Sequence, residues 1–332
     1  MKRVWIALAA VLAVILPARL YTVMTLAEAR TGLYAPADEG RIFAVAIASA
    51  CGVLLLMVLS AGRKTELSPL PLQSVGTALL AALTGLFTAG QSLAALTVSS
   101  GEGNRGMEIV LSLFGFLAAA AFLAAAYDFA SGSGLLRRHP LLGLLPSVWG
   151  CLGLISLFIN YAATVNRLEN VYNTFTVALL LLFLFSQAKF MAGMESRKSG
   201  RRVLLFGPAA AAMAFLTAVP DCVRYFGGKA SAGLFPVGVH LLCIVMAVYI
   251  LVYLAAVLRL SKTAPILKVA AASDETAAPA EAQENPERED SGQDGPDLLQ
   301  ACADFLKNSY HASEKFVEIR ENAACVEKGG KS

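Results

Sequence analysis

Residues 109–127 read IVLSLFGFLAAAAFLAAAY, nineteen residues without a charged side chain. The hydrocarbon core of a bilayer is about 30 Å thick and needs around 20 mostly apolar residues in an α-helix. Comparable runs cover 42–60, 77–97, 141–163, 171–188 and 234–258. Residues 4–24 and 203–226 are also long enough, although both carry ionisable side chains. The pattern predicts eight transmembrane helices.

The composition of the whole chain agrees with this pattern. Of its 332 residues, 57% are hydrophobic and 15% are charged, whereas soluble domains carry about 25% charged residues. A formal net charge of +3 also provides no strongly basic face for nucleic acid. We therefore expect residues 1–262 to form an all-α, polytopic transmembrane helical bundle whose partner is the lipid bilayer, with no nucleic acid bound.

The lysines and arginines that flank the spans predict the orientation. Fourteen of them fall on the side that holds both chain ends, and seven fall on the other side. Cytoplasmic loops carry the excess of Lys and Arg in most membrane proteins. We expect both termini in the cytoplasm, and the short loops and Ala/Leu richness suggest a bacterial plasma membrane.

The first span has two interpretations. Lys2 and Arg3, the apolar run at 4–16 and the sequence Ala27-Glu28-Ala29 fit a cleavable secretory signal, whose loss would leave seven spans. Alternatively the helix is retained, with Arg19 near its outer end, where a long side chain reaches the interface. We expect the retained helix.

Polar side chains near the outer ends of the spans are the candidate site. These are Arg19, Gln91, Asn160, Asp221, Arg224 and His240. Such groups are costly inside a bilayer, so they point to function by default. One interpretation is an outward-facing polar vestibule. The other is a set of interfacial anchors and interhelical hydrogen bonds, with Asp221 and Arg224 paired along one helix.

The C-terminal tail differs from the bundle. Residues 271–296 hold eight acids, one base and three prolines without an aromatic residue, so we expect 263–296 to be a disordered acidic linker. Apolar residues at alternating spacings of four and three then predict an amphipathic helix at 297–328. Its apolar face includes Leu298, Cys302, Phe305, Leu306, Phe316 and Ile319.

The polar face of this tail helix carries both acids and bases rather than the basic face of a membrane-surface helix. It therefore favours a cytoplasmic protein partner or self-association, and docking on the chain's own loops is the alternative.

Catalytic and metal motifs are missing from the sequence. It contains no His-Glu-x-x-His, no Gly-x-x-x-x-Gly-Lys-Ser/Thr and no Cys-x-x-Cys among its six cysteines. We expect no catalytic residue, no metal and no cofactor. The sequence favours a regulatory or scaffolding membrane protein that engages a partner through 297–328. The alternative is a small-solute or lipid-like transporter with an outward-facing polar vestibule.

Overall fold

The computed structural model describes residues 2–28, 34, 39–61, 67, 72–97, 105–163, 168–194, 196–229 and 235–275. The predicted tail helix at 297–328 lies outside these residues, as does the linker beyond 275. The last described helix covers 263–275, the first part of the predicted linker.

The described chain is helical apart from short connections. Its elements are α1 (Lys2–Tyr21), a π-helical turn (Thr22–Leu26), α2 (Glu39–Ala61), α3 (Val75–Thr97), α4 (Arg105–Ser131), α5 (Leu135–Arg138), α6 (Pro140–Ala163), α7 (Leu168–Met191), α8 (Ser196–Phe226) and α9 (Val237–Glu275). One isolated β-bridge joins Ala27 and Tyr34, and no strand occurs among the described residues. Eight helices in the described part of the chain are long and apolar enough to cross a membrane, which confirms the predicted all-α transmembrane bundle.

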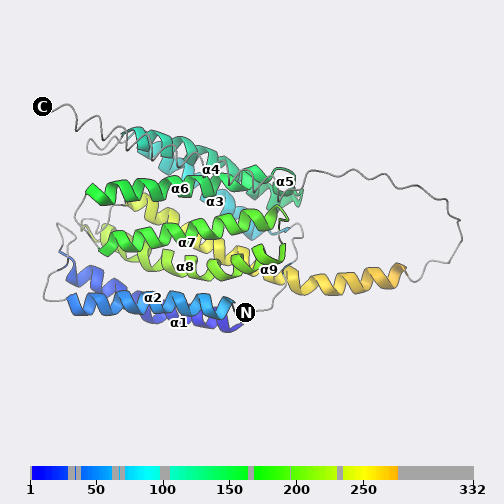
Figure 1. The fold of residues 1–332 in the computed structure, drawn as a ribbon, viewed down its shortest axis with the longest axis horizontal. Helices are drawn as coiled ribbons and strands as arrows, with labels where there is room; N and C mark the ends of the chain where they lie inside the picture. Colours follow the sequence, from blue (N-terminus) through cyan, green and yellow to red (C-terminus); the bar gives the residue numbers. More distant parts are fainter. Residues whose placement is uncertain are drawn as a thin grey trace, which may run out of the picture. The chain divides into compact units, whose positions relative to one another are not determined.

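Helix α8 is the central element of this bundle. It packs against α1, α2, α7 and α9, and further contacts of α9 with α3, α3 with α4, α4 with α6 and α6 with α7 close a ring of six helices. Figure 1 shows α1 and α2 side by side at the edge of that ring. The alanines at 209–212 of α8 have no exposed surface. Small side chains let neighbouring backbones approach closely, which is the main source of helix association in lipid.

Consecutive spans run in opposite directions, so each end of the bundle collects defined helix termini. The Arg19 end contains the end of α1, the start of α7, the end of α8 and the start of α9. The α5 end is the opposite one, where α5 connects α4 to α6.

An aromatic cluster lies in the ring interior toward the α5 end. Tyr253 of α9 lies 6.0 Å from Phe129 and 6.1 Å from Phe183, measured between ring centroids. Tyr249, one turn away, lies 6.2 Å from Phe122 in an edge-to-face arrangement. All five rings are buried. These rings form much of the core in this half of the ring, and the buried ion pair of Arg19 lies at the other end.

The contact between α3 and α4 depends on Gly85, and α3 offers a matched control in Gly90. A Cβ at Gly85 would lie 3.0 Å from the carbonyl oxygen of Ala119, whereas one at Gly90 would meet nothing within 4 Å. We expect Gly85→Val to lower the free energy of unfolding by about 1–3 kcal/mol, and Gly90→Val to change it by less than about 0.5 kcal/mol. Thermal unfolding in mild detergent measures both. Equal melting temperatures for the two variants would contradict this packing.

Candidate functional site

Buried polar side chains line one face of α7 and one face of α8 toward the Arg19 end. Each helix contributes three of them at spacings of three or four residues, which places them on one face. They are Glu169, Asn173 and Thr176 of α7, and Thr217, Asp221 and Arg224 of α8.

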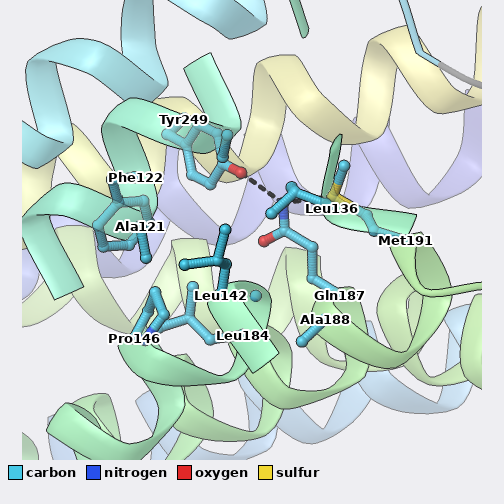
Figure 2. Close-up of a pocket in the computed structure, with 12 residues that line it drawn as sticks. Ala121, Phe122, Leu136, Leu142, Pro146, Leu184, Gln187, Ala188, Met191 and Tyr249 are labelled. Atoms are coloured by element: carbon cyan, nitrogen blue, oxygen red, sulfur yellow. Dashed lines mark hydrogen bonds between the residues drawn. The ribbon is translucent and has the colours of Figure 1, made fainter. Parts of the chain in front are cut away.

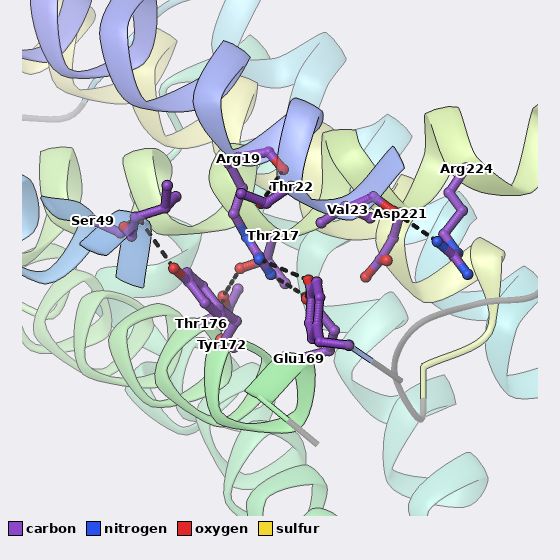
Figure 3. Close-up of polar contacts among 12 residues, drawn as sticks. Arg19, Thr22, Val23, Ser49, Glu169, Tyr172, Thr176, Thr217, Asp221 and Arg224 are labelled. Atoms are coloured by element: carbon purple, nitrogen blue, oxygen red, sulfur yellow. Dashed lines mark hydrogen bonds and ion pairs between the residues drawn. The ribbon is translucent and has the colours of Figure 1, made fainter. Parts of the chain in front are cut away.

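The hydroxyl groups of Thr176 and Thr217 fix the register between the two helices, because their Oγ1 atoms lie 2.8 Å apart. The helices are antiparallel, so one turn from this contact toward the Arg19 end brings Asn173 of α7 level with Asp221 of α8. Figure 3 shows the threonine contact with Asp221 and Glu169 beyond it.

Asn173, Asp221 and His240 form the next layer, here named the Asp221 layer. The Oδ2 atom of Asp221 lies 3.3 Å from Nε2 of His240 of α9, without the geometry of a hydrogen bond. Neither carboxylate oxygen of Asp221 and neither amide atom of Asn173 has a hydrogen-bond partner among the described residues. The three residues are at most 2% exposed. This layer therefore holds hydrogen-bonding groups whose capacity the described chain does not use.

The outer layer lies one turn farther out, and in it a buried cation pairs with a buried anion. The guanidinium of Arg19 forms an ion pair with the Glu169 carboxylate and lies 3.9 Å from the ring centroid of Tyr172. Tyr34, from the connection between α1 and α2, donates its hydroxyl to Glu169 and accepts a hydrogen bond from Arg19 at 3.2 Å. Burial and the nearby Glu169 carboxylate raise the pKa of Tyr34, so the phenol stays protonated and remains a donor.

Backbone carbonyls beyond α1 cover this end of the bundle. Arg224 Nη1 donates to the carbonyls of Val23 (2.7 Å) and Ala27 (3.2 Å), and its Nη2 donates to that of Glu28. Lys229 adds a 2.7 Å hydrogen bond to another carbonyl of the same segment. The π-helical turn therefore presents its carbonyl oxygens to cations from the end of α8.

The structure brings four of the six sequence candidates together: Arg19, Asp221, Arg224 and His240. All four are buried, and an outward-facing polar vestibule remains a prediction. The predicted direct pair between Asp221 and Arg224 is not formed, because Asp221 faces His240 and the Arg224 guanidinium reaches carbonyls.

The other two candidates lie elsewhere. Gln91 packs onto α9, where a Cβ at Gly238 would lie 1.9 Å from its Nε2 atom. Asn160 belongs to α6, and its side chain lies outside the described part of the structure.

Glu169, Tyr34 and Asn173 belong to the site, and the sequence alone did not point to them. A polar helix face is visible in the sequence at the start of this span, where Glu169, Asn173 and Thr176 are spaced by four and three residues. Tyr34 lies in a connection without periodicity, so no pattern could have assigned it.

The contacts of Arg19 also bear on the first span. Residues 2–26 supply the cation for Glu169 and carbonyl acceptors for Arg224. The apolar face of α1, with Leu8, Val11 and Ile15, packs into a cluster with α2 and α8. Helix α1 is therefore an integral part of the described bundle.

A series of substitutions that remove charge tests the ion pair of the outer layer. Arg19→Gln leaves the Glu169 carboxylate buried without its cation, which costs about 3–5 kcal/mol of stability. The double variant Arg19→Gln/Glu169→Gln removes both charges and should lose clearly less than the sum of the two single changes. Thermal unfolding in mild detergent measures the series, with the exposed Arg3→Gln on the same helix as the control. Additive losses in the double variant would show that the two side chains do not interact.

Among the residues that the structure describes, no group of three or more His, Cys, Asp or Glu side chains is arranged to hold a metal ion. No protein-family model matches this chain, and neither the curated proteins nor the solved structures gave a match.

Proposed function

We propose that the protein is a membrane carrier for a small polar solute and that the Asp221 layer binds this solute. The observation that carries the proposal is the lack of partners for Asn173 and for the Asp221 carboxylate. A buried polar group without a hydrogen bond costs about 1–3 kcal/mol, and more when it is charged. In a bilayer such groups mark substrate and ion pathways. A solute that supplies the missing hydrogen bonds would offset this cost.

The charges around the layer indicate the class of solute. Arg19 and Arg224 balance Glu169 and Asp221, so the site has no charge excess with which to attract a strongly ionic compound. The Asp221 carboxylate accepts hydrogen bonds only, whereas the Asn173 amide both donates and accepts. The solute should therefore carry N–H or O–H donors together with an acceptor, as small amines, amides and polyols do.

The local structure of α8 supports a binding role. Pro220 precedes Asp221 within the helix and has no N–H, so the carbonyl four residues earlier lacks its helical donor. Interrupted helices that expose carbonyls at the binding site are typical of secondary transporters.

We also infer the orientation from the distribution of lysine and arginine in the sequence. The α5 end, where positive charge is concentrated, is assigned to the cytoplasm of a bacterial plasma membrane. The Arg19 end then faces outward, and the segment at 22–28 with Tyr34 is the cover that a solute must displace.

Uptake by cells tests the carrier. Cells that express the chain are incubated with a ¹³C-labelled mixture of amino acids, amines, amides and polyols, and their contents are analysed by mass spectrometry. Wild-type protein should import at least one labelled compound. Asp221→Asn and Asn173→Leu should reduce that import at least about tenfold, which corresponds to the loss of one good hydrogen bond to a charged group.

The matched control is Ser49→Ala, which removes the 3.2 Å hydrogen bond of Tyr172 to α2 and leaves the Asp221 layer intact. Deletion of residues 276–332 should also leave import unchanged. If the deletion abolished import, or if Asp221→Asn and Asn173→Leu imported as well as wild type, the bundle would not be a carrier that uses this layer.

The pattern of the tail favours a second function, regulation or scaffolding through residues 297–328. The sequence supports it with a long amphipathic stripe behind an acidic linker. Helix α9 also continues to Glu275, well past the end of its apolar span at Ser261. Fourteen further helical residues would extend about 20 Å beyond that span.

Affinity capture tests this second function. The full chain and a variant that lacks 297–332 are purified in mild detergent, and the proteins that copurify are compared by mass spectrometry. A partner should be enriched with the full chain and lost with the deletion, and Phe305→Ala/Phe316→Ala should lose it as well because both rings lie on the predicted apolar face. Identical sets of copurifying proteins would contradict the proposal.

A further inference from the structure

A cavity of about 30 Å³ lies inside the ring at the α5 end, between α4, α6 and α7 (Figure 2). Small residues at the packing positions leave this space: Ala121 and Ala125 of α4, Gly143 of α6 and Ala188 of α7. The remaining lining side chains are mostly apolar. The cavity is about tenfold smaller than an ordinary site for a whole small molecule, so it admits only the end of an apolar chain.

The polar groups that line this cavity are already engaged with each other. Gln187 of α7 donates a hydrogen bond from Nε2 to the Tyr249 hydroxyl of α9. Both side chains are buried. The cavity thus differs from the Asp221 layer, since its polar side chains are matched and an apolar occupant leaves nothing unsatisfied.

Cationic side chains follow the cavity-lining residues directly in the sequence. Leu136 of α5 lines the cavity, and the exposed Arg137 and Arg138 come next. Lys189 follows Ala188 in the same way on α7 and lies over the Phe185 ring, 4.8 Å from its centroid. Arg137 also lies near the end of α7, since a Cβ at Gly193 would be 3.9 Å from its Nε atom. Basic residues of both α5 and α7 therefore adjoin residues that line the cavity.

Asp128 positions α5 rather than neutralising its arginines. Its carboxylate accepts hydrogen bonds from the backbone amides of Leu135 (2.7 Å) and Leu136 (3.3 Å) and from the Ser133 hydroxyl (3.0 Å). A carboxylate in this place caps the start of the short helix. As a result α5 is held against α4, α6 and α7, and its arginines are left exposed.

We infer that this site binds an anionic phospholipid from the leaflet at the α5 end. The phosphate lies on Arg137 and Arg138, and the end of an acyl chain enters the cavity. Basic pockets between membrane helices recognise anionic headgroups, and arginine pairs with phosphate through two parallel hydrogen bonds. The apolar cavity explains why a lipid fits here better than free phosphate does. The inference is independent of the proposed carrier function.

Native mass spectrometry of the full chain in mild detergent measures lipid binding. Phosphatidylglycerol and phosphatidylcholine of equal chain length are titrated separately, and glycerol phosphate is the headgroup probe without acyl chains. Wild-type protein should retain phosphatidylglycerol in preference to both other probes. Arg137→Gln/Arg138→Gln should weaken that binding about 30-fold, since each basic residue near a membrane surface contributes about fivefold.

The chain offers a matched control pair in Arg201 and Arg202, which are adjacent, exposed and near the start of α8. Arg201→Gln/Arg202→Gln should change the affinity less than about threefold. Gly143→Leu fills the cavity next to Ala188, which a Cβ at Gly143 would meet at 3.5 Å. This variant should weaken phosphatidylglycerol binding and leave the arginines in place.

Three results would overturn the inference: equal weakening by both arginine pairs, equal retention of the two lipids by wild type, or retention of glycerol phosphate as strong as that of the lipid. The wild-type comparison decides the question even if an arginine variant fails to fold.

Discussion

The interior of a bilayer supplies no water, so every polar group that the chain places there must find its partner within the chain or in a ligand. The ion pair between Arg19 and Glu169 meets this requirement for two buried charges. It joins α1 to α7 across 150 residues of sequence, and Tyr34 hydrogen-bonds to both partners. Without it, two charges would be stranded inside the bundle, and the cover formed by residues 22–28 would lose its anchor on α7.

The polar end of the bundle separates into layers with different degrees of matching. Thr176 and Thr217 bond to each other, and Arg19 and Glu169 neutralise each other. Between these two matched layers lies one in which Asn173 and Asp221 have no hydrogen-bond partner in the described chain. Interhelical contacts that serve only stability are expected to resemble the matched layers. We therefore base the proposed binding site on the contrast between adjacent layers rather than on the presence of polar residues alone.

The eight spans could be predicted because each requires only local information. A charge-free run at 42–60 predicts α2, which the structure extends to Glu39–Ala61, and a run at 234–258 predicts the span in α9. Arg19, Asp221 and His240 were also identifiable, since charge in an apolar run is visible in sequence. The side chains that each of them contacts could not be identified from the sequence. Asp221 and Arg224 are three residues apart and suggested a local pair, but the packing of α9 and of the segment after α1 gives each a different neighbour. Tyr34 and Asn173 belong to the site only because of tertiary contacts, which the sequence does not show.

The central claim is that the Asp221 layer holds a ligand that the chain does not itself provide. A cryo-electron microscopy map of the protein in lipid nanodiscs, resolved well enough to show side chains and ordered waters, tests it most directly. The account predicts density that does not belong to the chain, within hydrogen-bond distance of both the Asn173 amide and the Asp221 carboxylate. A map in which these two groups bond directly to each other or to neighbouring helices, with no further density between them, would contradict it.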